Sequence, residues 1–336
     1  MASFIKKILP FFDIALISVI LEVKTCTVFV KIVKNSKVIN TEEKKFDINN
    51  AELSSEVIKY INSYQDNYKF TYIGTLLGSI NQGAISGCKS DDFKKFGIRL
   101  DNIDFVCINN MLGVYGVDDD IVTTQNKFNK TVGIDFIYSP FVVLYQFFKK
   151  ELIDEAKLYV LCQKSYVALA VFKEKRFIFG AYFSIDTTED TFKEEGAKPS
   201  SSEVDVSDVN KDSEDEDLDE LVFFEDDEDV ISLDDSDEEE IEDYEDEDED
   251  ESDLSSIESF QEGVDLHNYI KSSIEEFYKN DKYETEFLSD IIIADSCSLT
   301  EDVKKYIEDE LMLNVKTKEI NIAKVTTDIM QKEVIG

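Results

Sequence analysis

The chain has little of what several common functions require. Its 336 residues include no tryptophan, three prolines and one histidine. A single histidine, His267, cannot anchor a His-rich metal site, and we expect it at the surface or as a helix cap. The cysteines stand singly within apolar stretches, without the short paired spacing of a zinc site or a redox motif; they are Cys26, Cys88, Cys107, Cys162 and Cys297. We therefore expect reduced, buried thiols and no metal centre.

Basic residues are also scarce. Lysine and arginine number 35 against 74 aspartates and glutamates, for a formal net charge of −39. Residues 187–262 hold 37 of the acidic residues and only 3 of the basic ones. The rest of the chain, with 37 acidic and 32 basic residues, is only mildly acidic. Since binding to nucleic acid needs a basic face, we expect no nucleic-acid partner for either part.

No apolar run reaches the roughly 18 residues that a membrane-spanning helix needs. The start of the chain, Lys6-Lys7 before ILPFFDIALISVIL, is similar to a signal peptide, but Asp13 interrupts the apolar run and no small-residue cleavage site follows. We therefore expect no export. Apolar residues around the lysine pair leave a short interfacial anchor or, as the favoured alternative, a first helix packed on a sheet. These residues are Phe4, Ile5, Ile8, Leu9, Phe11 and Phe12.

Two stretches of matching design dominate what the chain does contain. Within residues 1–46, the runs IALISVILEV, TVFVKIV and VINTEEKKF are separated by polar turns. Residues 158–184 repeat the plan, with turns at Gln163-Lys164 and at 173–176. Runs of β-branched and aromatic residues between polar turns predict strands. The two three-stranded meanders, each followed by mixed helix and strand, indicate two related lobes.

The remaining patterns predict α/β packing. Apolar residues at helical spacing predict helices over 51–64, 91–96, 264–278 and 301–313 and a further helix from Pro140. Strands are expected over 70–80, 102–109, 111–116, 131–138, 287–295 and 314–322, and a polar loop over 81–87. Thr300 is the expected N-cap of the helix over 301–313.

The acidic stretch cannot bury enough apolar surface to offset its chain entropy, so we predict that residues 187–262 are disordered. Two apolar clusters within it are typical of a segment that folds onto a partner, although a simple spacer remains the alternative. The candidate contact residues are Leu221, Phe223, Phe224, Val230, Ile231 and Leu233. The predicted domains are a first lobe over 1–152, a second lobe over 153–186 plus 263–336, and the insert over 187–262.

The two meanders, the strand DIIIAD before the helix EDVKKYIEDELML, and the phrase VGIDFIYSPFVVLYQFF together resemble the actin-like ATPase superfamily. Within it, the chain is most similar to the PilM proteins of type IV pilus systems and to the cytoplasmic part of their type II secretion relatives. The resemblance implies a two-lobed actin-like (ribonuclease-H-like) α/β fold with mixed sheets flanked by helices. The long acidic insert would be an addition to that fold.

The chain departs from this family at its nucleotide loops. Family members hold phosphates in two turns of the type Asp-x-Gly-Ser/Thr, where glycine lets backbone N–H groups approach the phosphate. Here the corresponding turns are Glu22-Val23-Lys24-Thr25 and Gln163-Lys164-Ser165. Glycines of the nucleoside site are replaced by Asp295-Ser296-Cys297. We therefore expect a pseudo-ATPase with no cofactor, although Lys24 and Lys164 leave weak nucleotide binding open.

The resemblance further implies a non-catalytic cytoplasmic scaffold, peripheral to the inner membrane. It would bind the cytoplasmic tail of a PilN-like single-span membrane protein and a cytosolic motor or ring component, with a homo-oligomeric ring as a further arrangement. The machine would be a type IV pilus, a type II secretion-like or competence apparatus, or a flagellar motor that uses a PilM, PilN and PilO module. Two alternatives remain: a divergent actin-like ATPase, and an acidic decoy or chaperone that acts through its insert.

Overall fold

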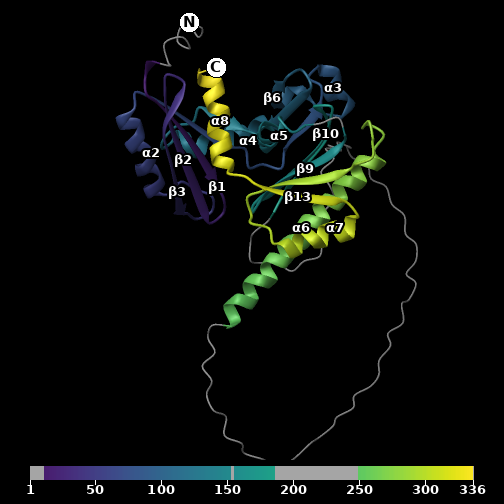
Figure 1. The fold of residues 1–336 in the computed structure, drawn as a ribbon. Helices are drawn as coiled ribbons and strands as arrows, with labels where there is room; N and C mark the ends of the chain where they lie inside the picture. The colour runs from purple at the N-terminus through teal and green to yellow at the C-terminus, as the bar shows by residue number, and fades with distance from the viewer. Residues whose placement is uncertain (1–10, 153–154, 186–248, 336) are drawn as a thin grey trace, which may run out of the picture.

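The computed structural model describes residues 11–152, 155–185 and 249–335. They form two five-stranded sheets, a smaller three-stranded sheet and the helices that cover them (Figure 1). None of the helices within these ranges is long and apolar enough to cross a membrane. Of the predicted N-terminal apolar residues, only Phe11 and Phe12 fall within these ranges. The predicted contact residues of the insert lie outside them; these are Leu221, Phe223, Phe224, Val230, Ile231 and Leu233.

The first sheet begins with the predicted meander, because polar turns separate three runs of strand-forming residues. Two parallel strands extend it, in the order β3-β2-β1-β4-β8. The strands are β1 (Ile14–Leu21), β2 (Thr25–Lys34), β3 (Lys37–Asp47), β4 (Phe70–Leu76) and β8 (Phe136–Tyr138). Helix α2 (Ser55–Asn67) covers one face, where its Val57 and Ile61 join the core around Ile17.

The second sheet repeats this plan in the order β11-β10-β9-β12-β13. Its strands are β9 (Lys157–Gln163), β10 (Tyr166–Lys173), β11 (Arg176–Ser184), β12 (Asp290–Asp295) and β13 (Asn314–Glu319). Strand β9 is antiparallel to β10 and parallel to β12, just as β1 is antiparallel to β2 and parallel to β4. The prediction of two lobes built on one plan is confirmed.

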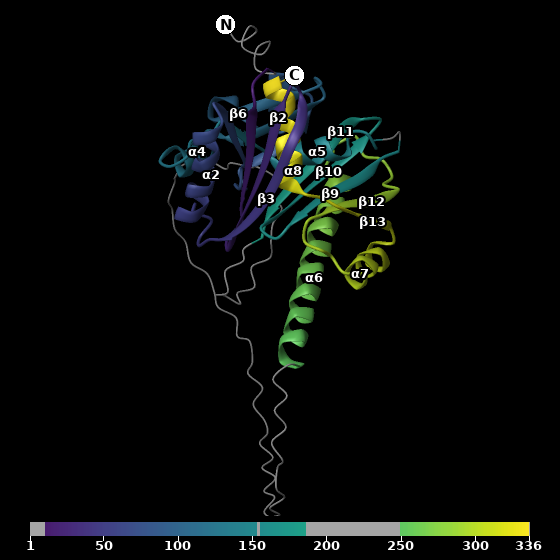
Figure 2. The same cartoon turned by 60° about the vertical axis from the view of Figure 1, so that its left-hand side comes forward.

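Two helices lie together on one face of the second sheet (Figure 2). They are α6 (Glu249–Lys279) and α7 (Glu301–Leu311). The predicted N-cap of α7 is confirmed, since Thr300 Oγ1 accepts a hydrogen bond from Val303 N at 3.3 Å. The Leu266 and Ile270 side chains of α6 are fully or almost fully buried in the core beneath it.

Helices α5 (Pro140–Phe148) and α8 (Ile322–Ile335) join the two sheets. Helix α5 contacts β9 and β10 of the second sheet, whereas α8 crosses back from the second sheet to pack on β1, β2 and β4 of the first (Figure 1). The approach of α8 is close, because a Cβ added at Gly74 of β4 would lie 2.8 Å from Met330 Sδ. The sequence analysis predicted no helix here, and it placed this segment within the second lobe.

The third sheet, in the order β5-β7-β6, lies against the outer strand β11 of the second. Its strands are β5 (Gln82–Ser86), β6 (Ile103–Ile108) and β7 (Leu112–Val117). Shorter elements surround it: α3 (Ser90–Lys95), the 3₁₀ helix η2 (Leu100–Asn102) and α4 (Asp118–Asn129). Strand β6 forms the outer edge of this small sheet and is largely exposed.

Three predicted elements are corrected. The predicted polar loop over 81–87 contains strand β5, which β7 holds by antiparallel pairing despite its weak strand sequence. The predicted strand over 131–138 reduces to Phe136–Tyr138, because residues 131–133 form the turn that ends α4. The predicted boundary of the insert at residue 262 falls inside α6, which begins at Glu249. The helix extends into the acidic stretch because each residue added to an existing helix gains a hydrogen bond while fixing few dihedral angles.

His267 is not at the surface as predicted. It is 5 % exposed, and its ring packs on that of Tyr306 with centroids 5.2 Å apart. The imidazole therefore fills the interface between α6 and α7. An amphipathic ring is tolerated there because a tilted aromatic neighbour replaces water around it.

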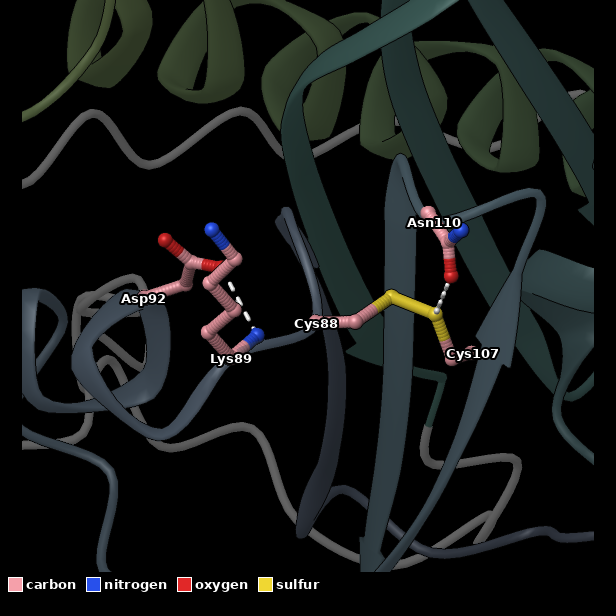
Figure 3. The surroundings of a disulfide bond; sticks show 5 residues. All are labelled: Cys88, Lys89, Asp92, Cys107 and Asn110. Carbon is pink, nitrogen blue, oxygen red and sulfur yellow. Dashed lines mark hydrogen bonds between the residues drawn. A yellow bond between two sulfur atoms is a disulfide. The ribbon is translucent and has the colours of Figure 1, made fainter.

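The expectation of five reduced, buried thiols is wrong for two cysteines. Cys88 and Cys107 form a disulfide that ties the segment after β5 to strand β6 (Figure 3). Cys107 is exposed rather than buried. The antiparallel sheet brings the two residues within bonding distance, which spacing along the chain did not reveal. Beside the disulfide, the backbone N–H of Lys89 donates to Asp92 Oδ2 at 2.7 Å and so caps α3.

Candidate functional site

The two turns that correspond to phosphate loops meet in the structure. Gln163, at the end of β9, donates through Nε2 to Glu22 Oε1 in the turn between β1 and β2, at 3.1 Å. The other oxygen of Glu22 accepts a hydrogen bond from Thr25 Oγ1 at 2.6 Å. A direct hydrogen bond thus joins the turns of the two sheets, and it places a carboxylate between them.

The third predicted loop closes onto the same place. Ser296 Oγ donates to the Cys162 carbonyl at 2.7 Å, and the sulfurs of Cys162 and Cys297 lie 3.3 Å apart. The Asp295 carboxylate accepts from the N–H groups of Cys297 and Leu299, each at 2.8 Å, so both of its oxygens serve the loop itself. The structure therefore brings the three predicted loops together, as their strand positions implied.

The electrostatics of this cleft do not suit a nucleotide. Lys24 and Lys164 are exposed to solvent at the tips of their turns, while Glu22 and Asp295 are half-buried. Contact with Cys297 and burial raise the pKa of the Cys162 thiol, so that it stays protonated. A bound triphosphate needs backbone donors and cations, and here the residues that meet offer carboxylates, thiols and an amide. The residues present do not fit a nucleotide.

An open groove lies elsewhere, and the sequence analysis did not predict it. It has a volume of about 670 Å³ and separates strand β6 from strand β8, with α5 and α8 forming its floor. Val106 and Phe105 on its β6 side are 60 % and 44 % exposed. Among the described residues, β6 pairs only with β7 and β8 only with β4. The groove therefore lies between two strands that are each the last strand of their sheet.

Hydrogen bonds fix the two walls relative to each other. Asn109 Nδ2, in the turn between β6 and β7, donates to Tyr145 OH of α5 at 2.7 Å. Ser139 Oγ, just before α5, donates to Gln82 Oε1 at 2.6 Å. Gln82 Nε2 in turn donates to the Leu77 carbonyl at 2.8 Å. These bonds join the small sheet to the start of α5, so the width of the groove is set before any partner arrives.

Polar groups, of which Tyr138 is buried and Asp135 is exposed, line the β8 wall. Desolvation raises the pKa of Asp135, whose carboxylate accepts a hydrogen bond from Ile73 N at 2.8 Å. Burial also raises the pKa of Tyr138, and the nearby Glu333 carboxylate adds to the effect. Lys149 and Lys332 line the groove as well. A signal for this site was present in the apolar β6 sequence IDFVCI, which lacks the alternation of a half-buried strand.

Comparison with protein-family models identifies the family of the chain. A family model described as a domain of unknown function (DUF8341) matches residues 158–335, more than half of the chain. The chain belongs to the DUF8341 family. A second model, described as a domain of unknown function (DUF8569), matches residues 12–145 of this DUF8341 member. No curated protein matches it in sequence.

Solved structures show its fold. The DUF8341 chain is similar to the PilM-PilN type IV pilus biogenesis complex, with a TM-score of 0.53 and 8 % identity over 95 % of this chain and 98 % of that chain. A Bacteroides thetaiotaomicron protein with an actin-like ATPase fold and unknown function gives a TM-score of 0.49 and 8 % identity over 94 % and 95 % of the two chains. The ethanolamine utilization protein EutJ from Carboxydothermus hydrogenoformans gives 0.41 and 8 % over 100 % and 99 %. The predicted PilM-like, actin-like fold is confirmed.

Proposed function

We propose that this DUF8341 protein is a non-catalytic, PilM-like scaffold that binds the cytoplasmic tail of a PilN-like, single-span inner-membrane protein. The observation that carries the proposal is the open groove between β6 and β8, on a fold similar to that of the PilM-PilN complex. A tail of this kind would lie in the groove as an extended segment. The protein would then be cytoplasmic and peripheral to the inner membrane.

The groove favours an extended segment over a helix. Strand edges offer backbone donors and acceptors in a row, which an added strand satisfies. The exposed side chains of Phe105 and Val106 supply apolar contact on the two faces of such a strand. A rigid groove with its walls already joined also loses little conformational entropy on binding.

The closed cleft supports a role without nucleotide hydrolysis. A phosphate entering between the two turns would have to break the bond between Gln163 and Glu22 and approach the Glu22 carboxylate. The phosphate and the Glu22 carboxylate are both negatively charged, so they would repel each other. We therefore propose that the cleft holds the two sheets together, and that no step of the protein's function passes through ATP.

The test is binding of cytoplasmic tail peptides from single-span membrane proteins encoded beside this chain. Val106→Asp places a charge in the groove, and Val38→Asp is a matched control because Val38 is an exposed valine, 49 % accessible, on the edge strand β3. We expect one tail to bind the wild-type chain and the control, and to lose at least about tenfold in affinity with Val106→Asp. Equal binding by all three proteins, or no tail bound at all, would contradict the proposal.

The parent machine is proposed only as a class: a pilus, a secretion or competence apparatus, or a flagellar motor. The same peptide experiment addresses it, since the gene whose product supplies the binding tail belongs to one of these machines. A motor or ring component, and self-assembly into a ring, are further proposed contacts. Analytical ultracentrifugation with and without the bound tail tests the ring.

A further inference from the structure

A second cavity opens beside the groove, with which it shares Gln146, Lys149 and Lys332. The C-terminal half of α8 lines it, and Figures 1 and 2 show where that helix ends. The cavity has a volume of about 490 Å³. Lys149 and Lys150, which directly follow α5, face it together with Lys332 from the last turn of α8. Further lining comes from polar residues that can donate hydrogen bonds, namely Ser36, Gln146 and Gln331.

The cavity carries a surplus of positive charge. Its one acidic lining residue, Asp328, already forms an ion pair with Lys31, a lysine of β2 that is only 2 % exposed. Asp328 is therefore paired with a lysine that does not line the cavity. Three lysines thus line the cavity beside a single lining carboxylate, that of Asp328, which acts on both Lys31 and Lys332.

Two of these lysines are neighbours. Lys149 and Lys332 line both this cavity and the groove, and the charge of Lys149 acts on Lys332. Lys149 Nζ donates to Gln146 Oε1 at 2.9 Å. Desolvation, the contact with Lys149 and the charge of Lys150 lower the pKa of Lys332 to about 8. Lysines at helix C-termini interact well with helix dipoles, which accounts for their position. It does not account for two neighbouring ammonium groups, which repel each other unless an anion lies between them.

We propose that this cavity binds a phosphate group. Three converging ammonium groups match a multiply charged oxyanion, since lysine acts as a compact point charge with three donors. The amides of Gln146 and Gln331 and the hydroxyl of Ser36 supply neutral donors for the remaining oxygens. This site is separate from the closed cleft and does not depend on the proposed tail-binding role.

The phosphate has two sources that fit the chemistry. One is a soluble phosphate compound, and the other is the headgroup of an anionic lipid. Two observations support the lipid source. Phe11, just before β1, is 74 % exposed. The ion pair of Asp13 with Lys34 joins this end of β1 to the end of β2, which lies beside the lining residue Ser36. An exposed aromatic ring next to lysines is a common arrangement at membrane surfaces.

The experiment uses the full chain and two probes. Calorimetry with sodium pyrophosphate tests the soluble source, and co-sedimentation with phosphatidylcholine vesicles, with and without phosphatidylglycerol, tests the lipid source. Lys150→Gln is the informative variant, because Lys150 lines this cavity but not the groove. Lys305→Gln, at an exposed lysine of α7, is the charge-matched control.

We expect at least one probe to bind the wild-type chain, and Lys150→Gln to weaken that binding about fivefold or more, since one ammonium charge near an anion is worth that factor even in water. Lys305→Gln should bind like the wild type. Binding of pyrophosphate identifies the soluble source, and binding of anionic vesicles alone identifies the lipid. Binding of neither probe, or equal weakening by both substitutions, overturns the proposal. Both lysines are exposed, so both variants should fold, which thermal melts confirm.

Discussion

Gln163 Nε2 donates a hydrogen bond to Glu22 Oε1 across 3.1 Å, and through this bond the second sheet touches the first at the turns where the resembled family holds phosphates. Each residue stands where the resembled family has a different type, and the two residues complement each other. Together they form a contact where the family has a nucleotide site. The consequence is a molecule whose two sheets are joined without a ligand.

This relationship is measurable as a coupling energy. A double-mutant cycle with Glu22→Ala and Gln163→Ala should give a coupling of about 1 kcal/mol in the free energy of unfolding, because the bond has one charged partner and is partly buried. Urea denaturation of the four proteins provides the values. Additive effects of the two substitutions would mean that the turns do not interact.

The same contact predicts that ATP does not bind. Isothermal calorimetry with ATP and magnesium should give no heat beyond dilution for the wild-type chain, because a phosphate would meet the Glu22 carboxylate. The Glu22→Ala variant is the informative comparison, since it removes that carboxylate. Micromolar binding by the wild-type chain would contradict a pseudo-ATPase and favour the divergent ATPase.

The disulfide should matter only in an oxidising medium. Cys107→Ser should lower the free energy of unfolding by about 3 kcal/mol, the loop entropy for a bond that links residues 19 apart in sequence. With excess dithiothreitol present, the wild type and the variant should be equally stable. In cells, trapping of free thiols by a maleimide would report whether Cys88 and Cys107 are bonded there, since cytosolic proteins seldom keep disulfides.

The two buried free thiols should be slow to react. Burial raises the pKa of Cys26 to about 12, and contact with Cys297 and burial raise that of Cys162. Because only the thiolate attacks alkylating agents, iodoacetamide at about pH 8 should leave both residues unmodified in the native chain. Mass spectrometry after brief treatment checks this, with urea-unfolded chain as the control. Rapid labelling of Cys162 in the native chain would show that the cleft opens.

Lys332 should make stability depend on pH. Its folded-state pKa of about 8 lies below the ordinary value of 10.5, so between these values the unfolded chain binds more protons and wild-type stability rises with pH. Lys332→Gln should therefore be slightly more stable than the wild type at pH 7. The gain should shrink towards about pH 10, and it should be small because solvent screens an exposed lysine. Melting temperatures of both proteins, with Lys305→Gln as control, test the trend.

The close approach of α8 gives a packing prediction. Gly74→Ala should cost about 1–3 kcal/mol, because the new Cβ would lie 2.8 Å from the sulfur of Met330, which is fully buried. Gly78→Ala is the matched control, since nothing lies within 4 Å of a Cβ added there. Thermal denaturation of both variants gives the comparison. Equal stability would show that α8 adjusts its position without cost.

Local sequence patterns predicted the two repeated meanders well, but they did not predict the elements that depend on distant parts of the chain. The two meanders and the Thr300 cap follow from turn residues and strand formers that lie next to each other in sequence. Strand β5 and the disulfide depend on pairing with strands far along the chain, which QGAIS and two single cysteines do not reveal. Helix α8 was missed because the predicted edge strand was extended to Ile322, into its first turn.

The candidate sites divide in the same way. The three loops could be placed together from strand order and resemblance, although the bond between Glu22 and Gln163 depends on side-chain reach. The groove and the lysine cavity could not be predicted, because each forms where elements distant in sequence come side by side. Lys149, for example, directly follows α5, whereas Lys332 lies in the last turn of α8, so the two come together only after α8 has crossed to the first sheet.

That crossing has a consequence for how the chain is made. The apolar face of β1, β2 and β4 receives its cover from residues 322–335, which leave the ribosome long after the sheet itself. Until then, this face is exposed to water and to other nascent chains, and domain-by-domain folding from the N-terminus cannot be completed. A fragment ending near residue 152 should therefore need a chaperone or aggregate, whereas supplying α8 as a separate peptide should rescue its solubility.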